Sequence, residues 1–94
     1  MEKHRKAVMA QVTGRVQGVS FRMWTLREAE RLGLTGWVRN EPDGSVVALL
    51  VGSESAIADM LERLWIGPAG ATVVTVEFGE VEPDAVPARF HITG

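Results

Sequence analysis

Two glycines and an arginine stand where a β-rich run gives way to a helical pattern near the N-terminus. The segment TGRVQGVSFR carries Gly14, Gly18 and Arg22. The first backbone N–H groups of a helix have no partner within the helix, and the helix dipole adds positive potential there. Glycines let a chain bend so that several amides meet one anion, and a guanidinium in the first helical turn can bind two of its oxygens. The pattern favours a site for a phosphoryl group or a similar oxyanion.

A second candidate is Asn40, which ends a β-like run just before the turn residues EPDG. A side-chain amide donates and accepts hydrogen bonds at once, so it can orient a water molecule. A simpler interpretation is that asparagine favours the turn, that the glycines serve turn geometry, and that Arg22 is solvated. Both interpretations stay open on these residues alone.

The sequence lacks the residues that several other kinds of binding or catalytic site require. The loop has neither the Gly-Lys-Ser/Thr of a Walker A loop nor the G-x-G of a dinucleotide site. The chain has no cysteine, which excludes a disulfide, a thiolate zinc site and a cysteine nucleophile. The two histidines, His4 and His91, are near the chain ends, and the acidic residues do not cluster like metal ligands. We expect no metal and no cofactor.

The composition limits the class of protein further. Ninety-four residues, 46% of them hydrophobic, are expected to form one domain over residues 1–94. The net charge of −2 argues against general nucleic-acid binding, which needs a basic surface. The basic opening MEKHRK is followed by too short and too polar a run for a signal peptide, and no apolar run reaches membrane-spanning length. We therefore expect a cytoplasmic protein that binds neither membrane nor nucleic acid.

Alternating strand and helix patterns predict the elements that position these candidates. They are, in order, a strand at 7–13, a helix at 21–32, strands at 35–40 and 45–51, a helix after Ser53 that ends before Gly67, a strand at 71–78 and a short terminal strand within 90–93. Two right-handed crossovers about one hairpin place both helices on one face of a four- to five-stranded antiparallel sheet. The expected fold class is α+β, a ferredoxin-like split βαβ sandwich (βαββαβ).

Finer features are predicted for each element. Ser20 and Ser53 are expected to be helix N-caps. The run 46–51 is apolar at positions facing both sides of a sheet, so it is expected to be a central strand. The side chains expected to share one side of a helix are Phe21, Trp24, Glu28, Ala29 and Leu32 in the first, and Ile57, Met60, Leu61, Leu64 and Trp65 in the second. Glu28 is the one member of the first set that does not suit a core. The tryptophans Trp24, Trp37 and Trp65 are expected in or beside the core.

Taken together, the segments GRVQGVSFR, GLTGWVRNEPDGSV, GPAGATV and FHI, in this order, resemble the acylphosphatase family over residues 8–92. The resemblance implies a small cytosolic hydrolase that cleaves acyl phosphates to a carboxylate and inorganic phosphate. Arg22 matches the family's phosphate-binding arginine, and Asn40 matches the asparagine that positions the attacking water. The residues that match the phosphate-binding loop are Arg15, Val16, Gln17, Gly18, Val19 and Ser20.

The chemistry agrees with a site that has no obvious acid, base, nucleophile or metal. The carboxylate that leaves an acyl phosphate is stable at neutral pH, so no general acid is needed. What remains is to hold the phosphoryl group, stabilise its oxygens and place a water in line. The proton of that water can pass to a phosphoryl oxygen of the substrate. Inorganic phosphate is then a product and a competitive inhibitor, and we expect the enzyme to be a monomer.

Two alternatives belong to other functional classes. A ferredoxin-like module could bind an anion or a partner without turnover. An RNA-recognition module of the same topology is disfavoured, because it would need exposed aromatic residues on its central strands, and residues 7–13 contain none.

Overall fold

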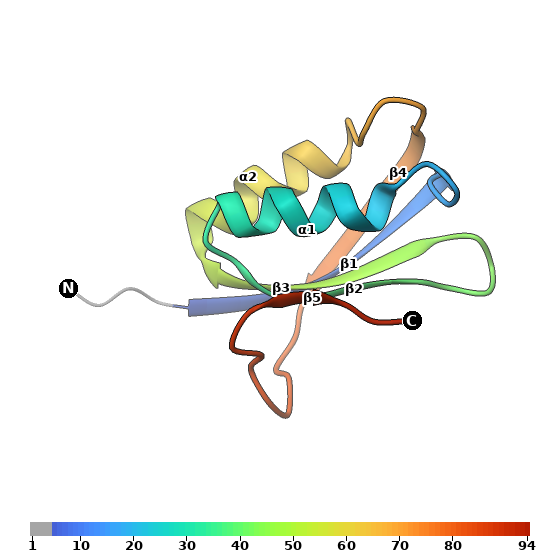
Figure 1. Cartoon of the computed structure of the whole chain (residues 1–94). Helices are drawn as coiled ribbons and strands as arrows, with labels where there is room; N and C mark the ends of the chain where they lie inside the picture. The colour runs from blue at the N-terminus through green and yellow to red at the C-terminus, as the bar shows by residue number, and fades with distance from the viewer. Residues whose placement is uncertain (1–4) are drawn as a thin grey trace.

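A computed structural model describes residues 5–94, so His4 lies outside the described residues. The elements are β1 (Arg5–Arg15), α1 (Phe21–Arg31), β2 (Thr35–Asn40), β3 (Val46–Ser53), α2 (Glu54–Leu64), β4 (Thr72–Glu80) and β5 (Phe90–Ile92). This order confirms the prediction, and Figure 1 shows both helices on one face of the sheet.

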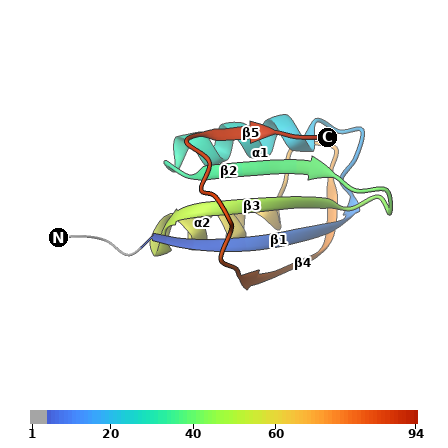
Figure 2. The ribbon, with the colours of Figure 1, turned by 90° about the horizontal axis from the view of Figure 1, so that it is seen from below.

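The five strands follow the order β4-β1-β3-β2-β5, which confirms the ferredoxin-like α+β fold and the central place of β3. Neighbouring strands are antiparallel except β2 and β5, which pair in parallel, so the prediction of a fully antiparallel sheet is wrong at this edge. Residues 81–89 carry the chain from one edge of the sheet to the other across the face without helices (Figure 2). Because β4 ends level with the start of β2, a direct crossing makes β5 run in the same direction as β2.

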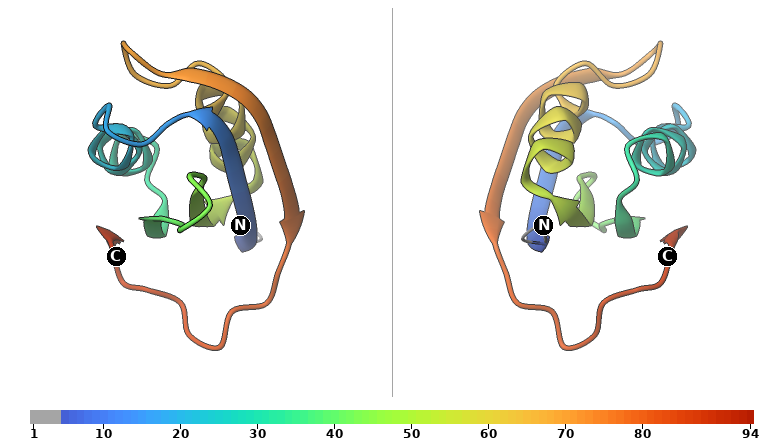
Figure 3. Two further views of the ribbon diagram at one scale, coloured as in Figure 1. Left: turned by 90° about the vertical axis from the view of Figure 1, so that its right-hand side faces the viewer. Right: turned by 90° about the vertical axis from the view of Figure 1, so that its left-hand side faces the viewer.

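The end views show the sheet and the two helices as two layers (Figure 3), and the buried side chains of the core lie between these layers. Alternate residues of β1 point into it, because successive side chains of a strand face opposite sides of a sheet. The buried side chains include Val8, Ala10 and Val12 of β1, Ala48 and Leu50 of β3, and Ile57, Met60 and Leu64 of α2. Large apolar side chains are exposed on the edge strand β4 and on residues 81–89, Phe78 and Val86 among them.

The predicted side of α1 faces the core, and Glu28 is the exception that the sequence already indicated. Phe21 and Ala29 are buried, and Thr25 is the third buried residue of the helix. Glu28 instead lies at the helix–helix boundary, where Oε1 accepts a hydrogen bond from Arg31 at 2.9 Å and pairs with Nε of Arg63 of α2 at 3.2 Å. A carboxylate here is therefore paired across the two helices rather than buried in the core.

Tryptophan packing was predicted correctly at two of three positions. Trp24 packs against the core beside Phe21, with ring centroids 5.4 Å apart, and the half-buried Trp37 lies under the guanidinium of Arg39 at 4.6 Å. Trp65 is 52% exposed, so its predicted place in the apolar stripe is wrong.

Within residues 5–94, no helix has the length and apolar character needed to cross a membrane.

Candidate functional site

Strand β1 runs further toward the glycine-bearing loop than predicted. Arg15 is its last residue and pairs with Thr72 of β4, so it lies at a strand end and not within the loop. The pairing register shifts between Thr13 and Gly14, where a side chain would meet the carbonyl oxygen of Thr72. Gly14, with φ of 123°, therefore permits the close approach of β4. The prediction that Gly14 bends the loop around an anion is replaced by this role.

The bend itself is made by Gly18 and Ser20. Their φ angles are 78° and 64°, and Ser20 is the one non-glycine residue with a positive φ between residues 5 and 94. Ser20 occupies the predicted N-cap position of α1, but its side chain makes no capping bond because the backbone is left-handed. By contrast, the extended Ser53 caps α2 as predicted, accepting from the Ala56 amide at 3.2 Å. A left-handed serine costs about 1–2 kcal/mol, and such conformations gather at functional sites.

The bend leaves a run of backbone amides without acceptors. The first backbone hydrogen bond of α1 is donated by Trp24 to the carbonyl oxygen of Ser20, at 3.0 Å. In the described chain, the N–H groups of residues 17–23 donate to no backbone oxygen. Free amides at a helix N-terminus form a binding site for an anion.

Five of these seven residues line a pocket of about 430 Å³ that also reaches β2 and β5. It is lined by Val16, Gly18, Ser20, Phe21, Arg22, Met23, Asn40 and Ile92. The pocket therefore brings together Arg22 and Asn40, which come from separate motifs. Of the other loop residues expected at the site, Arg15, Gln17 and Val19 do not line it.

Three apolar lining residues were missed by the sequence analysis: Phe21, Met23 and Ile92. Phe21 is buried, whereas Met23 and Ile92 are 42% and 36% exposed. The exposed pair forms an apolar rim beside the arginine. Met23 could have been noticed because it follows Arg22 directly, but Ile92 reaches the pocket only through the parallel pairing of β5 with β2.

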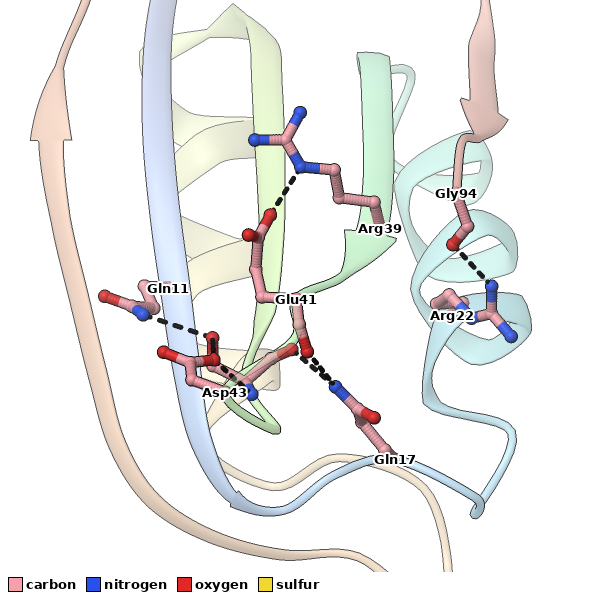
Figure 4. Close-up of polar contacts among 8 residues, drawn as sticks. Gln11, Gln17, Arg22, Arg39, Glu41, Asp43 and Gly94 are labelled. Atoms are coloured by element: carbon pink, nitrogen blue, oxygen red, sulfur yellow. Dashed lines mark hydrogen bonds and ion pairs between the residues drawn. The ribbon is translucent and has the colours of Figure 1, made fainter.

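Arg22 is the single charged residue among those that line the pocket. Its Nη1 donates to the carbonyl oxygen of Gly94 at 2.8 Å, so the chain after β5 holds the guanidinium in place (Figure 4). Asn40 ends β2, where its backbone pairs with Val46 of β3, and within residues 5–94 no hydrogen bond engages its side chain. The pocket thus combines a fixed cation, free amides and a free carboxamide.

A polar network supports the β2–β3 hairpin that follows Asn40. Asp43 Oδ1 accepts hydrogen bonds from the amide and the hydroxyl of Ser45, at 2.9 and 2.6 Å (Figure 4). These bonds, the hydroxyl's first, hold the pKa of Asp43 below its ordinary value. The carboxylate is therefore charged at neutral pH, and its contribution to stability is lost only as the pH falls through that lowered pKa.

The remaining candidates carry no competing site. Among residues 5–94 no three His, Asp or Glu side chains are grouped to hold a metal ion, and His91 is exposed on β5. A larger hollow of about 760 Å³ lies at the opposite end of β1, beside Lys6 and Glu80. Lys6 pairs there with Glu80 at 2.9 Å and with Glu54 at 3.4 Å, which raises its pKa, so its charge is already neutralised.

Comparisons with known proteins identify the family and the fold. The model of the family described as Acylphosphatase matches residues 8–92. An acylphosphatase of Rhizobium etli is 57% identical over 94 residues, which is the full length of both chains. The structure of an acylphosphatase from Coxiella burnetii has a TM-score of 0.90 at 35% identity, covering 95% of this chain and 93% of that one. The acylphosphatase structure from Bacillus subtilis has a TM-score of 0.90 at 33% identity, covering 97% and 100%.

Proposed function

The chain belongs to the acylphosphatase family of hydrolases, and we propose that it cleaves acyl phosphates by in-line attack of water on a phosphoryl group held by Arg22 and the loop amides. The observation that carries this mechanism is the run of free N–H groups at residues 17–23, beside the one charged side chain of the pocket. Amides and a fixed guanidinium stabilise the charge on the phosphoryl oxygens without having to reorganise.

Asn40 supplies the other half of the mechanism. Its carboxamide lines the same pocket with no partner within the described chain, so it is free to donate to and accept from one water molecule. Fixing that water in line with the scissile P–O bond lowers the entropic cost of the reaction. No lining residue is an acid or a base, which suits a substrate whose carboxylate leaves unprotonated.

The acyl group has an apolar surface available on the pocket's rim, formed by Met23 and Ile92. Apolar acyl groups such as benzoyl would remove these side chains from water, which favours binding by about 25 cal/mol per Å² of buried apolar area. Inorganic phosphate, which carries only the phosphoryl part of the substrate, should compete for the amides and Arg22. A cytoplasmic location and a monomeric state remain predictions from the sequence.

The proposed function is tested by the choice of substrate. The protein should hydrolyse benzoyl phosphate at an undiminished rate in excess EDTA, with a higher kcat/KM than for acetyl phosphate. It should hardly hydrolyse phenyl phosphate, because phenoxide is a much more basic leaving group than a carboxylate and needs a proton donor that the pocket lacks. Loss of ultraviolet absorbance measures benzoyl phosphate cleavage, and phosphate release measures the others.

Two results would contradict this proposal. Activity abolished by EDTA and restored by magnesium would require a metal site. Tight phosphate binding without turnover of any acyl phosphate would instead identify a binding module that is not an enzyme.

A further inference from the structure

The two halves of the pocket belong to elements that are not neighbours in the sheet. The phosphate-binding loop follows β1, and Asn40 ends β2, while β3 lies between these strands. No β-ladder therefore fixes the loop directly against the Asn40 strand. In residues 5–94, one side chain connects residues 16–23 to the hairpin residues 40–45 by hydrogen bonds, and it is Gln17.

Gln17 reaches out of the loop with its carboxamide turned toward the hairpin (Figure 4). Its Nε2 donates to the carbonyl oxygens of Glu41 and Ser45, both at 2.9 Å. Glu41 directly follows Asn40, and the buried Ser45 directly precedes β3. The carboxamide of Gln17 thus binds both strand ends of the hairpin, at Glu41 and at Ser45. Glu41 is one residue from Asn40, the side chain proposed to orient water.

The hairpin does not need Gln17 to close. The Glu41 amide donates to the Ser45 carbonyl at 2.8 Å, and the Gly44 amide donates to the Glu41 carbonyl at 3.1 Å. Asp43 and Ser45 add two further bonds within the turn. The two hydrogen bonds from Gln17 are not needed to close the hairpin. What they fix is the distance between the hairpin and the loop.

We propose that Gln17 is a positioning residue, which sets the separation between the phosphate-binding amides and Asn40. This inference rests on the proposed function, in which Asn40 orients the attacking water and the loop binds the phosphoryl group. In-line attack tolerates little error, and a displacement of about 1 Å can cost roughly a hundredfold in rate. Gln17 would act through Asn40 without touching the substrate.

The test is a double-mutant cycle with benzoyl phosphate. Gln17→Met keeps the length of the side chain and removes both donors. We expect it to lower kcat roughly tenfold to a hundredfold and to change the inhibition constant of inorganic phosphate less than about twofold, since the loop amides remain. In an Asn40→Ala background, the same substitution should lower kcat no further, because the group that it positions is already gone.

Gln11→Met is the matched control. Gln11 also donates to Ser45 of the hairpin, to Oγ at 3.1 Å, but it extends from β1 and not from the loop. We expect this variant to keep kcat near the wild-type value. If Gln17→Met does not fold, Gln17→Ala, which adds no apolar bulk, is measured in the same way.

Two outcomes would overturn the inference: a kcat near wild type in Gln17→Met, or an equal loss of kcat in the Asn40→Ala background. A kcat near wild type together with weaker phosphate affinity would mean a role in ordering the loop, and an equal loss in both backgrounds would mean a general structural role. The wild-type and Asn40→Ala reference measurements separate these results from failure of the proposed function, because that failure would already be visible in them.

Discussion

Arg22→Ala should abolish turnover of benzoyl phosphate, with a loss of kcat/KM of at least roughly a thousandfold, and should weaken phosphate inhibition. The reason is that Arg22 is the one charged residue lining the pocket, where the phosphoryl charge would be placed. Removing an arginine that stabilises a phosphoryl transition state costs about 10³ to 10⁵ in rate. Steady-state kinetics with benzoyl phosphate, with and without inorganic phosphate, measure both effects.

Arg22→Lys should not restore activity, since an ammonium is a point charge and cannot copy the planar fork of a guanidinium. The matched control is Arg63→Ala, which removes an arginine paired with Glu28 away from the pocket and should leave kcat unchanged. The loss of the bond to Gly94 makes thermal unfolding a necessary companion measurement. A folded Arg22→Ala protein with nearly normal kcat and phosphate affinity would contradict the assignment of this arginine.

Asn40→Ala should lower kcat roughly a hundredfold or more and leave the phosphate inhibition constant almost unchanged. The amides of residues 17–23 and Arg22 are intact in this variant, so binding of the phosphoryl group persists. The attacking water loses its orientation, and one positioned polar group in a transition state is worth about 10² to 10³ in kcat. Measuring kcat, phosphate inhibition and Tm together separates this effect from a change in stability.

If Asn40 only shaped the turn before Pro42, Asn40→Ala would lower Tm modestly and keep the turnover per folded molecule. Asn40→Asp is a useful companion, because it keeps the size of the side chain and removes the donor. A folded and nearly fully active Asn40→Ala enzyme would remove the water-orienting half of the mechanism.

The elements could be predicted from the sequence because their signals are local. The apolar run 46–51 identified the central strand, and Ser53 identified the start of α2, since a capping bond joins residues three positions apart. The direction of β5 could not be predicted, because it depends on where β4 ends and how residues 81–89 cross the sheet.

The site was predicted less completely than the fold. Arg22 and Asn40 were predicted as site residues and lie on one pocket, while their roles stay predictions. The left-handed Ser20 was missed because serine has no strong preference for positive φ. The hydrogen bonds from Gln17 to Ser45 and from Arg22 to Gly94 join residues 28 and 72 positions apart, so no local sequence pattern predicts them.

The central claim is that water attacks the phosphorus atom of an acyl phosphate held by the loop and Arg22. Hydrolysis of benzoyl phosphate in water enriched in oxygen-18, stopped early and analysed by mass spectrometry, tests it most directly. Attack at phosphorus breaks the P–O bond, so the label is predicted to enter inorganic phosphate and to be absent from benzoate. Label in benzoate would mean attack at the carbonyl carbon and would contradict a site built to hold the phosphoryl group.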